Sequence, residues 1–110
     1  MTFDEIVERC SKIRVNEKRV TKPDYVEWVV FAEDLPQWDI ILSDLFGGVA
    51  KPQGQKTTAE DFALTEKFGG IYDDQTLYRC TLDDGIVLAM IWPWQNKVFA
   101  TIKFALVPPP

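Results

Sequence analysis

Hydrophobic and polar residues repeat with two different periods along the chain, and the change of period separates expected helices from expected strands. Near the start, apolar residues recur every three or four positions, which is the spacing of one helical face. These residues are Phe3, Ile6, Val7, Cys10 and Ile13. Thr2 and Glu5 fit the capping-box pattern, in which the threonine hydroxyl accepts a free backbone N–H. The pattern predicts a helix over residues 3–14 within an N-terminal segment of residues 1–15.

The next part of the chain changes from a strand pattern to a second helical one. Residues 25–32 are rich in β-branched and aromatic side chains, which predicts a strand. Asp34 follows, where a carboxylate can cap a helix, and Pro36 falls in the first turn, where proline is tolerated. The apolar spacing continues to a glycine pair at residues 47–48, which predicts the end of this helix.

The middle of the chain is polar and contains a short third helical pattern. Residues 49–58 read as a surface loop because they combine glycine, proline and polar side chains. Thr58 predicts the start of a short helix, with Phe62 and Ala63 facing inward. The glycine pair at residues 69–70 predicts its end.

The last third predicts an antiparallel meander. Three strand-like runs cover residues 75–82, 86–92 and 97–107, and Asp84-Gly85 between the first two is a strong signal for a two-residue hairpin turn. The three prolines at 108–110 cannot continue a strand, which predicts an extended tail. The chain therefore predicts one α+β domain over residues 1–110. Its sheet would have about four strands, mainly antiparallel, with two to three helices packed on one face.

Both faces of this meander carry apolar side chains. A turn at Asp84-Gly85 pairs Leu82 with Val87 on one face and places Thr81 beside Leu88 on the other. An antiparallel sheet in a small domain usually leaves one face polar, so the second face requires a cover. That cover is the 47–75 segment folded back, a bound ligand or another subunit. The residues expected to meet a ligand or partner there are Leu77, Arg79, Leu88, Met90, Trp92, Trp94 and Phe99.

The amino-acid composition excludes several kinds of catalytic site. The chain has no histidine and only two cysteines, so histidine-based triads and an all-cysteine zinc site are excluded, and no metal or cofactor is predicted. Glu27 lies in the middle of an apolar strand, where a carboxylate needs a partner, and Arg79 is the expected one. The alternative enzyme hypothesis uses Glu27 with a tyrosine as acid and base. The available tyrosines are Tyr25, Tyr72 and Tyr78.

The net charge of the chain limits the kinds of partner that it can bind. The net charge of −5 repels nucleic acid and anionic lipid at long range, and no apolar run is long enough to cross a membrane. The acidic start predicts an untargeted, cytoplasmic protein with reduced cysteines. A basic run is the local exception and predicts either a solvated surface or an anion site; the solvated surface is favoured because no glycine-rich loop accompanies it. Its cations are Lys12, Arg14, Lys18, Arg19 and Lys22.

The order of a strand, a helix and three antiparallel strands resembles the βαβββ module of the vicinal-oxygen-chelate family. The likeness covers residues 24–107 and is carried by the Tyr25–Phe31 strand, Asp34-Leu35 and the Phe46-Gly47-Gly48 helix end. Enzymes of that family often place histidine metal ligands on the sheet, and this chain has no histidine. The resemblance implies a metal-free binding relative that pairs modules to close a cavity.

These observations favour a non-enzymatic binding module that forms a homodimer. Its ligand would be a small apolar molecule or a protein partner. The tryptophans at the end of the sheet carry this hypothesis, because each offers a large apolar plate with one hydrogen-bond donor. A pocket is therefore expected beside Trp92 and Trp94, at or near the interface between two copies.

Overall fold

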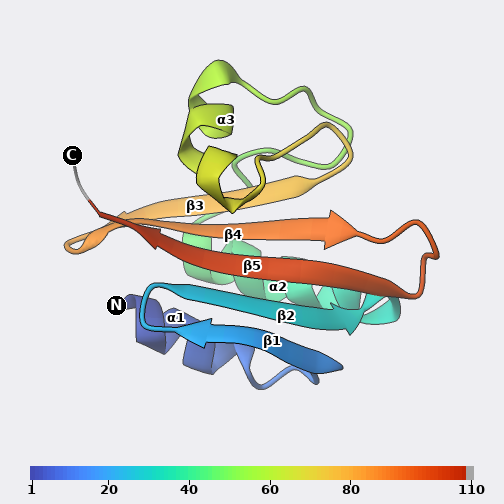
Figure 1. The fold of residues 1–110 in the computed structure, drawn as a ribbon. Coiled ribbons are helices and arrows are strands. Elements are labelled where there is room, and N and C mark those ends of the chain that lie inside the picture. Colours follow the sequence, from blue (N-terminus) through green and yellow to red (C-terminus); the bar gives the residue numbers. More distant parts are fainter. Residues whose placement is uncertain (109–110) are drawn as a thin grey trace.

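One five-stranded antiparallel sheet forms the centre of the protein in a computed structural model that describes residues 1–108 (Figure 1). The strand order is β1-β2-β5-β4-β3. The strands are β1 (Glu17–Lys22), β2 (Tyr25–Phe31), β3 (Thr76–Leu82), β4 (Gly85–Pro93) and β5 (Phe99–Val107). The helices are α1 (Phe3–Cys10), α2 (Leu35–Phe46) and α3 (Ala59–Thr65), with short 3-10 turns η1 (Ala32–Asp34) and η2 (Glu66–Phe68). The predicted α+β class and antiparallel sheet are confirmed.

The sheet has a fifth strand that the hydrophobic pattern does not indicate. β1 lies in the basic run and pairs with β2, with a register shift between Lys18 and Val20. Val20 is its only residue that is not fully exposed. An edge strand has no partner on one side, and charged side chains together with a bulge discourage pairing with another chain. The expected count of about four strands was one short because this strand has no alternating apolar face.

α1 begins and α2 ends at the residues that the sequence predicts. The Thr2 hydroxyl accepts from the Glu5 N–H, as the capping-box pattern predicts, although α1 ends at Cys10 instead of residue 14. α2 ends at Gly47, whose φ of 78° is the left-handed geometry that glycine adopts without strain. Asp34 does not cap α2 as predicted, because its carboxylate instead accepts from Arg14 Nε at 2.7 Å.

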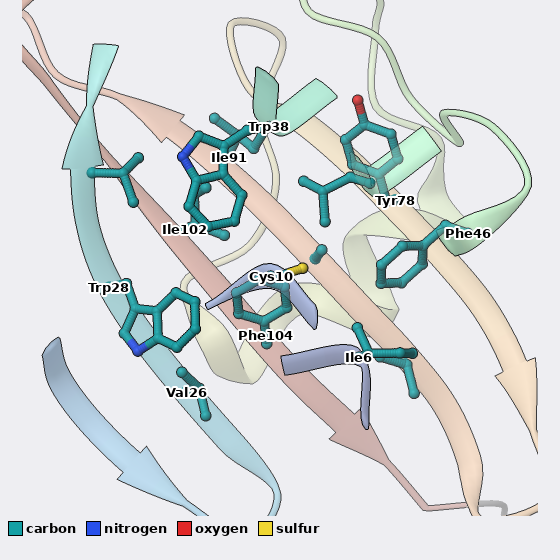
Figure 2. Packing of buried hydrophobic residues seen from close by; sticks show 14 of the residues in the cluster. Ile6, Cys10, Val26, Trp28, Trp38, Phe46, Tyr78, Ile91, Ile102 and Phe104 are labelled. Carbon is teal, nitrogen blue, oxygen red and sulfur yellow. The ribbon is translucent and has the colours of Figure 1, made fainter. Parts of the chain in front are cut away.

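α1 and α2 cover one side of the sheet, called here the helix face (Figures 1 and 2). Figure 2 shows Trp38 and Phe46 of α2 and Ile6 and Cys10 of α1 over strand side chains such as Ile102. These residues belong to one continuous cluster, and four of the five named here are fully buried, with Phe46 7% exposed. Burying aliphatic and aromatic side chains against one another supplies most of the stabilisation of such a core.

The β3–β4 hairpin has a different register from the predicted one, yet the same faces. Leu82 pairs with Gly85 and Cys80 with Val87, so Asp83 and Asp84 form the turn. The shift of pairing is two residues, and side chains alternate faces every residue, so each side chain keeps its predicted side. Gly85 has φ 140°, and a Cβ there would lie 2.1 Å from the Val107 carbonyl oxygen.

The other side of the sheet is covered by residues 47–75, called here the covering segment, which contains α3. Ile71 belongs to a second apolar cluster on this side of the sheet, which is called here the segment face. Leu64 and Phe68 pack against this cluster. Figure 1 shows α3 on the side of the sheet opposite α1 and α2. The expectation that all helices share one face was therefore wrong. Of the three alternatives for the second face, the chain's own segment supplies the cover over β3 and β4.

Within α3 the inward positions differ from those predicted. Phe62 is 38% exposed and Ala63 is also exposed, whereas Asp61 and Thr65 are buried. Thr58 caps this helix as expected, because its hydroxyl accepts from the Asp61 N–H at 3.1 Å. Pro109 and Pro110 of the predicted tail lie outside the described residues. No helix in residues 1–108 is long and apolar enough to span a membrane.

Candidate binding site

The turn between β4 and β5 holds an aromatic pair at one end of the sheet. The Trp94 N–H donates to the Phe99 carbonyl, and the Trp94 carbonyl accepts from the Lys97 N–H. Lys97 adopts a φ of 60°, which closes the turn. The Asn96 side chain accepts from the Val98 N–H at 2.9 Å. The rings of Trp94 and Phe99 meet edge to face, with centroids 5.4 Å apart. The backbone bonds and the ring contact together fix both aromatic side chains.

The Trp94 ring is restrained at its polar edge as well. Its indole Nε1–H donates to the Thr101 hydroxyl at 2.9 Å. The Arg19 guanidinium lies over the same ring, 5.5 Å from its centroid. Because the only donor of the indole is already used, the ring offers a ligand an apolar plate in a fixed orientation.

A pocket of about 370 Å³ lies against this aromatic pair and is called here the end pocket. Apolar side chains from four elements line it together with four polar residues. The lining residues are Ala32, Leu35, Gln53, Asp74, Pro93, Trp94, Gln95, Lys97 and Phe99. A smaller pocket of about 140 Å³ shares Leu35, Gln53 and Pro93 with it, so the concave surface continues along the start of α2.

Trp92 does not line the end pocket, although the sequence predicts a pocket beside it. Its ring lies under the covering segment, where a Cβ on Gly69 would come within 2.4 Å of it. The Lys103 ammonium sits 3.3 Å from the ring centroid and donates to the Phe68 carbonyl at 2.8 Å. Burial lowers the pKa of Lys103, and Glu27 opposes that shift. Lys103 and Trp92 thus join the sheet to the end of η2.

A second buried lysine joins the two ends of the covering segment beside the sheet edge. Lys51 is 1% exposed, and its ammonium donates to the carbonyls of Pro52, Asp73 and Gln75 at 3.1, 3.1 and 2.6 Å. Its backbone also bridges to Leu77 of β3. All three N–H donors of the side chain are satisfied, which offsets the cost of burying the charge. Burial lowers the pKa of Lys51.

Three of the predicted interface residues lie inside the protein. Leu77, Leu88 and Met90 are each 0% exposed beneath the covering segment. Arg79 is 36% exposed and lies 3.3 Å from Glu60 and 3.2 Å from Asp61, both in α3. It does not pair with Glu27, so the predicted ion pair between these residues was wrong.

Two residues of the enzyme alternative, Glu27 and Tyr25, lie together, whereas Tyr78 lies apart from them. Glu27 accepts from the Tyr25 hydroxyl at 2.7 Å on the segment face, whereas Tyr78 belongs to the helix-face cluster. Tyr78 donates to Asp39 at 2.8 Å, and burial together with this bond raises its pKa to about 12. Burial raises the pKa of Tyr25 as well. Tyrosines with raised pKa values exchange protons poorly near neutral pH.

The two cysteines are structural side chains. Cys10 is fully buried in the helix-face cluster, and burial raises its pKa from 9.0 to about 12, which opposes the thiolate form. Cys80 is partly buried on the same face, and burial raises its pKa too. In residues 1–108, no three cysteine, aspartate or glutamate side chains gather in a way that could hold a metal ion.

Several residues of the site lie outside the sequence prediction. Trp94 and Phe99, which the sequence names as candidate contact residues, line the end pocket, and Leu35, Gln53 and Asp74 join them from segments far apart in the chain. The pattern places Leu35 on an apolar helix stripe and Gln53 in a polar loop, and neither feature indicates a pocket. Comparisons with known proteins add no assignment: no family model, curated protein or solved structure gives a significant match to this chain.

Proposed function

We propose that this protein is a non-enzymatic binding domain whose end pocket holds a small, flat organic ligand. The fixed Trp94 plate carries this proposal. Its indole donor is used by Thr101 and its ring meets the Phe99 ring edge to face, so the plate is oriented before any ligand arrives. A preformed aromatic surface loses little conformational freedom on binding, which leaves more of the contact energy as affinity.

The composition of the end pocket fits the usual character of a ligand site. Its volume of about 370 Å³ falls within the usual range for small-molecule sites. Apolar residues form the walls, and Gln53, Asp74 and Lys97 provide a few polar groups that can orient a ligand. The enzyme alternative has less support because Tyr78 lies on the opposite face from Glu27, and the Tyr25 hydroxyl that Glu27 does contact has a raised pKa.

The homodimer stays a prediction, but the apolar patch from which it was predicted is not on the surface. The patch formed by Leu77, Leu88 and Met90 is buried by the covering segment, so it does not explain why two copies would associate. Two copies that pair would have to use other surfaces.

Ligand-observed NMR with a library of flat aromatic fragments tests the proposed site. We expect fragments to bind the wild type and to bind Trp94→Ala at least about tenfold more weakly, since the stacking surface is lost. Tyr72→Ala is the matched control, because Tyr72 is an aromatic residue 52% exposed outside the pocket. Fragment binding that is unchanged by Trp94→Ala, or reduced equally by both variants, would contradict the proposal.

A further inference from the structure

A second pocket lies at the other end of the sheet. It has a volume of about 410 Å³ and is lined by Lys22, Asp24, Tyr25, Lys67 and Phe68; it is called here the lysine pocket. β2 begins at Tyr25 beside this pocket and ends at Phe31, which pairs with Phe99 of the end pocket. The two pockets share no residue, so evidence for one does not bear on the other.

The lysine pocket contains a preformed aromatic ledge. The rings of Tyr25 and Phe68 stack almost in parallel, with centroids 5.6 Å apart and an angle of 7° between planes. The Tyr25 hydroxyl is held by Glu27, and the Phe68 carbonyl is held by Lys103. Both residues of the ledge are therefore fixed by hydrogen bonds beneath the pocket.

Two cations border the same ledge. Lys22 and Lys67 are exposed, and neither forms an ion pair with a carboxylate of the described residues 1–108. The Lys67 ammonium lies 5.6 Å from the centre of the Phe68 ring. Asp24 is the one carboxylate in the lining, so the pocket has a local excess of one positive charge in a protein of net charge −5.

We propose that the lysine pocket binds a flat aromatic monocarboxylate. The ring of the ligand lies against the Tyr25–Phe68 ledge, and its carboxylate accepts hydrogen bonds from the ammonium groups of Lys22 and Lys67. A single negative charge matches the local excess, whereas a polyanion would meet Asp24 and the acidic remainder of the protein. This assigns a binding role to Lys22 from the basic run, where a solvated surface was the favoured interpretation.

The probe is 2-naphthoate, titrated into the isotope-labelled protein and followed by NMR at the rings of Tyr25 and Phe68. 2-Naphthalenemethanol is the neutral comparison, because it keeps the ring and lacks the charge. We expect saturable shifts at both rings with 2-naphthoate, and at least about tenfold weaker binding of the neutral analogue. Added salt should weaken binding of 2-naphthoate, since the lysines are exposed.

The decisive variant is Lys22→Gln combined with Lys67→Gln, which keeps side-chain length and removes both charges. The matched control is Lys12→Gln combined with Lys56→Gln, since both are exposed, lie outside either pocket and change the net charge equally. We expect at least about tenfold weaker binding in the first variant and no change in the control. Equal affinity in both variants would overturn the proposal, as would shifts confined to Trp94 and Phe99, which would instead place the probe in the end pocket.

Discussion

The two faces of the sheet are buried by different chemistry. On the helix face, side chains such as Trp38, Leu42 and Ile102 form a continuous apolar cluster, and all three are fully buried. On the segment face, a smaller apolar cluster is combined with two buried lysines, Lys51 and Lys103, that bind backbone carbonyls. In an apolar cluster, the stabilisation is spread over many buried atoms. On the segment face, a larger share of it depends on the hydrogen bonds of two single residues. The covering segment should therefore open more easily than the helix face.

Removing a core side chain from the helix face should give the largest effect. Leu42→Ala leaves a cavity under α2, where Leu42 is 0% exposed. We expect a loss of about 3 kcal/mol in the free energy of unfolding, measured by urea denaturation. Ile40→Ala is the control in the same helix, because Ile40 is 72% exposed and should change stability by less than about 0.5 kcal/mol. Similar losses in both variants would mean that α2 does not pack as described.

Removing the Lys51 anchor should have the next largest effect. Lys51→Met keeps a long side chain but removes the donors to the carbonyls of Pro52, Asp73 and Gln75. We expect a loss of about 2 kcal/mol in the free energy of unfolding, because three hydrogen bonds from a charged donor are lost. Lys56→Met is the control at an exposed lysine of the same segment. An unchanged urea midpoint in Lys51→Met would show that the Lys51 ammonium does not stabilise the covering segment.

Buried lysines and buried thiol or phenol groups should change the stability in opposite directions at alkaline pH. On the helix face, the folded pKa values of Cys10 and Tyr78, each raised to about 12, lie above their ordinary values of 9.0 and 10.0. Between these pH values the folded chain binds more protons than the unfolded chain. The stabilisation that is present below pH 9.0 is therefore lost as the pH rises towards about 12. On the segment face, the lowered pKa values of Lys51 and Lys103 make stability rise as pH approaches their ordinary 10.5, whereas the raised pKa of Tyr25 opposes this rise.

Urea midpoints measured from pH 8 to pH 11 separate these contributions. Each titrating group changes stability by at most about 1.4 kcal/mol per pH unit. We expect Cys10→Ala to lose less stability on alkalinisation than the wild type. In the wild type, ionisation of the Cys10 thiol favours the unfolded chain, and the variant lacks this thiol. We expect Lys51→Met to lose more, because one of the two opposing lysines is gone. Parallel pH profiles for all three proteins would contradict the assignment of these groups.

The ion pair at the sheet edge should contribute least. Arg79 reaches Glu60 and Asp61 of α3 but is 36% exposed, so solvent screens the attraction. We expect Arg79→Gln to lower the free energy of unfolding by less than about 1 kcal/mol, measured by urea denaturation. Arg19→Gln is the control, because the Arg19–Glu17 pair lies on the exposed strand β1. A loss above about 2 kcal/mol in Arg79→Gln would make this pair a main anchor of the covering segment.

The sequence predicts the helix face well because a single periodic signal determines it. The apolar spacing of α1 and α2 identifies the side chains that pack, and even the misplaced hairpin turn preserves the faces, because the error is an even number of residues. β1 could not be predicted, since its stability depends on pairing with β2 and only Val20 is shielded. A strand without an apolar face leaves no signal in the pattern.

The segment face and the end pocket depend on contacts that no local pattern encodes. Lys51 lies in a polar stretch and has the appearance of a solvated lysine, yet it binds carbonyls more than twenty residues away in sequence. Trp94 and Phe99 could be predicted for the pocket because they flank one short turn. Gln53 and Asp74 could not, because only the folding of the covering segment brings them to that turn.

Hydrogen exchange of the wild type tests the central claim most directly, which is that the chain covers its own second sheet face. The amides of Ala50 and Lys51 donate to the Leu77 carbonyl, and the Leu77 amide donates to the Lys51 carbonyl, so these three amides report attachment of the covering segment to β3. We expect them to exchange at least about a hundredfold more slowly than in an unfolded chain, and at the same rate after about tenfold dilution, because the cover is intramolecular. Exchange at unfolded rates, or protection that disappears on dilution, would contradict the account.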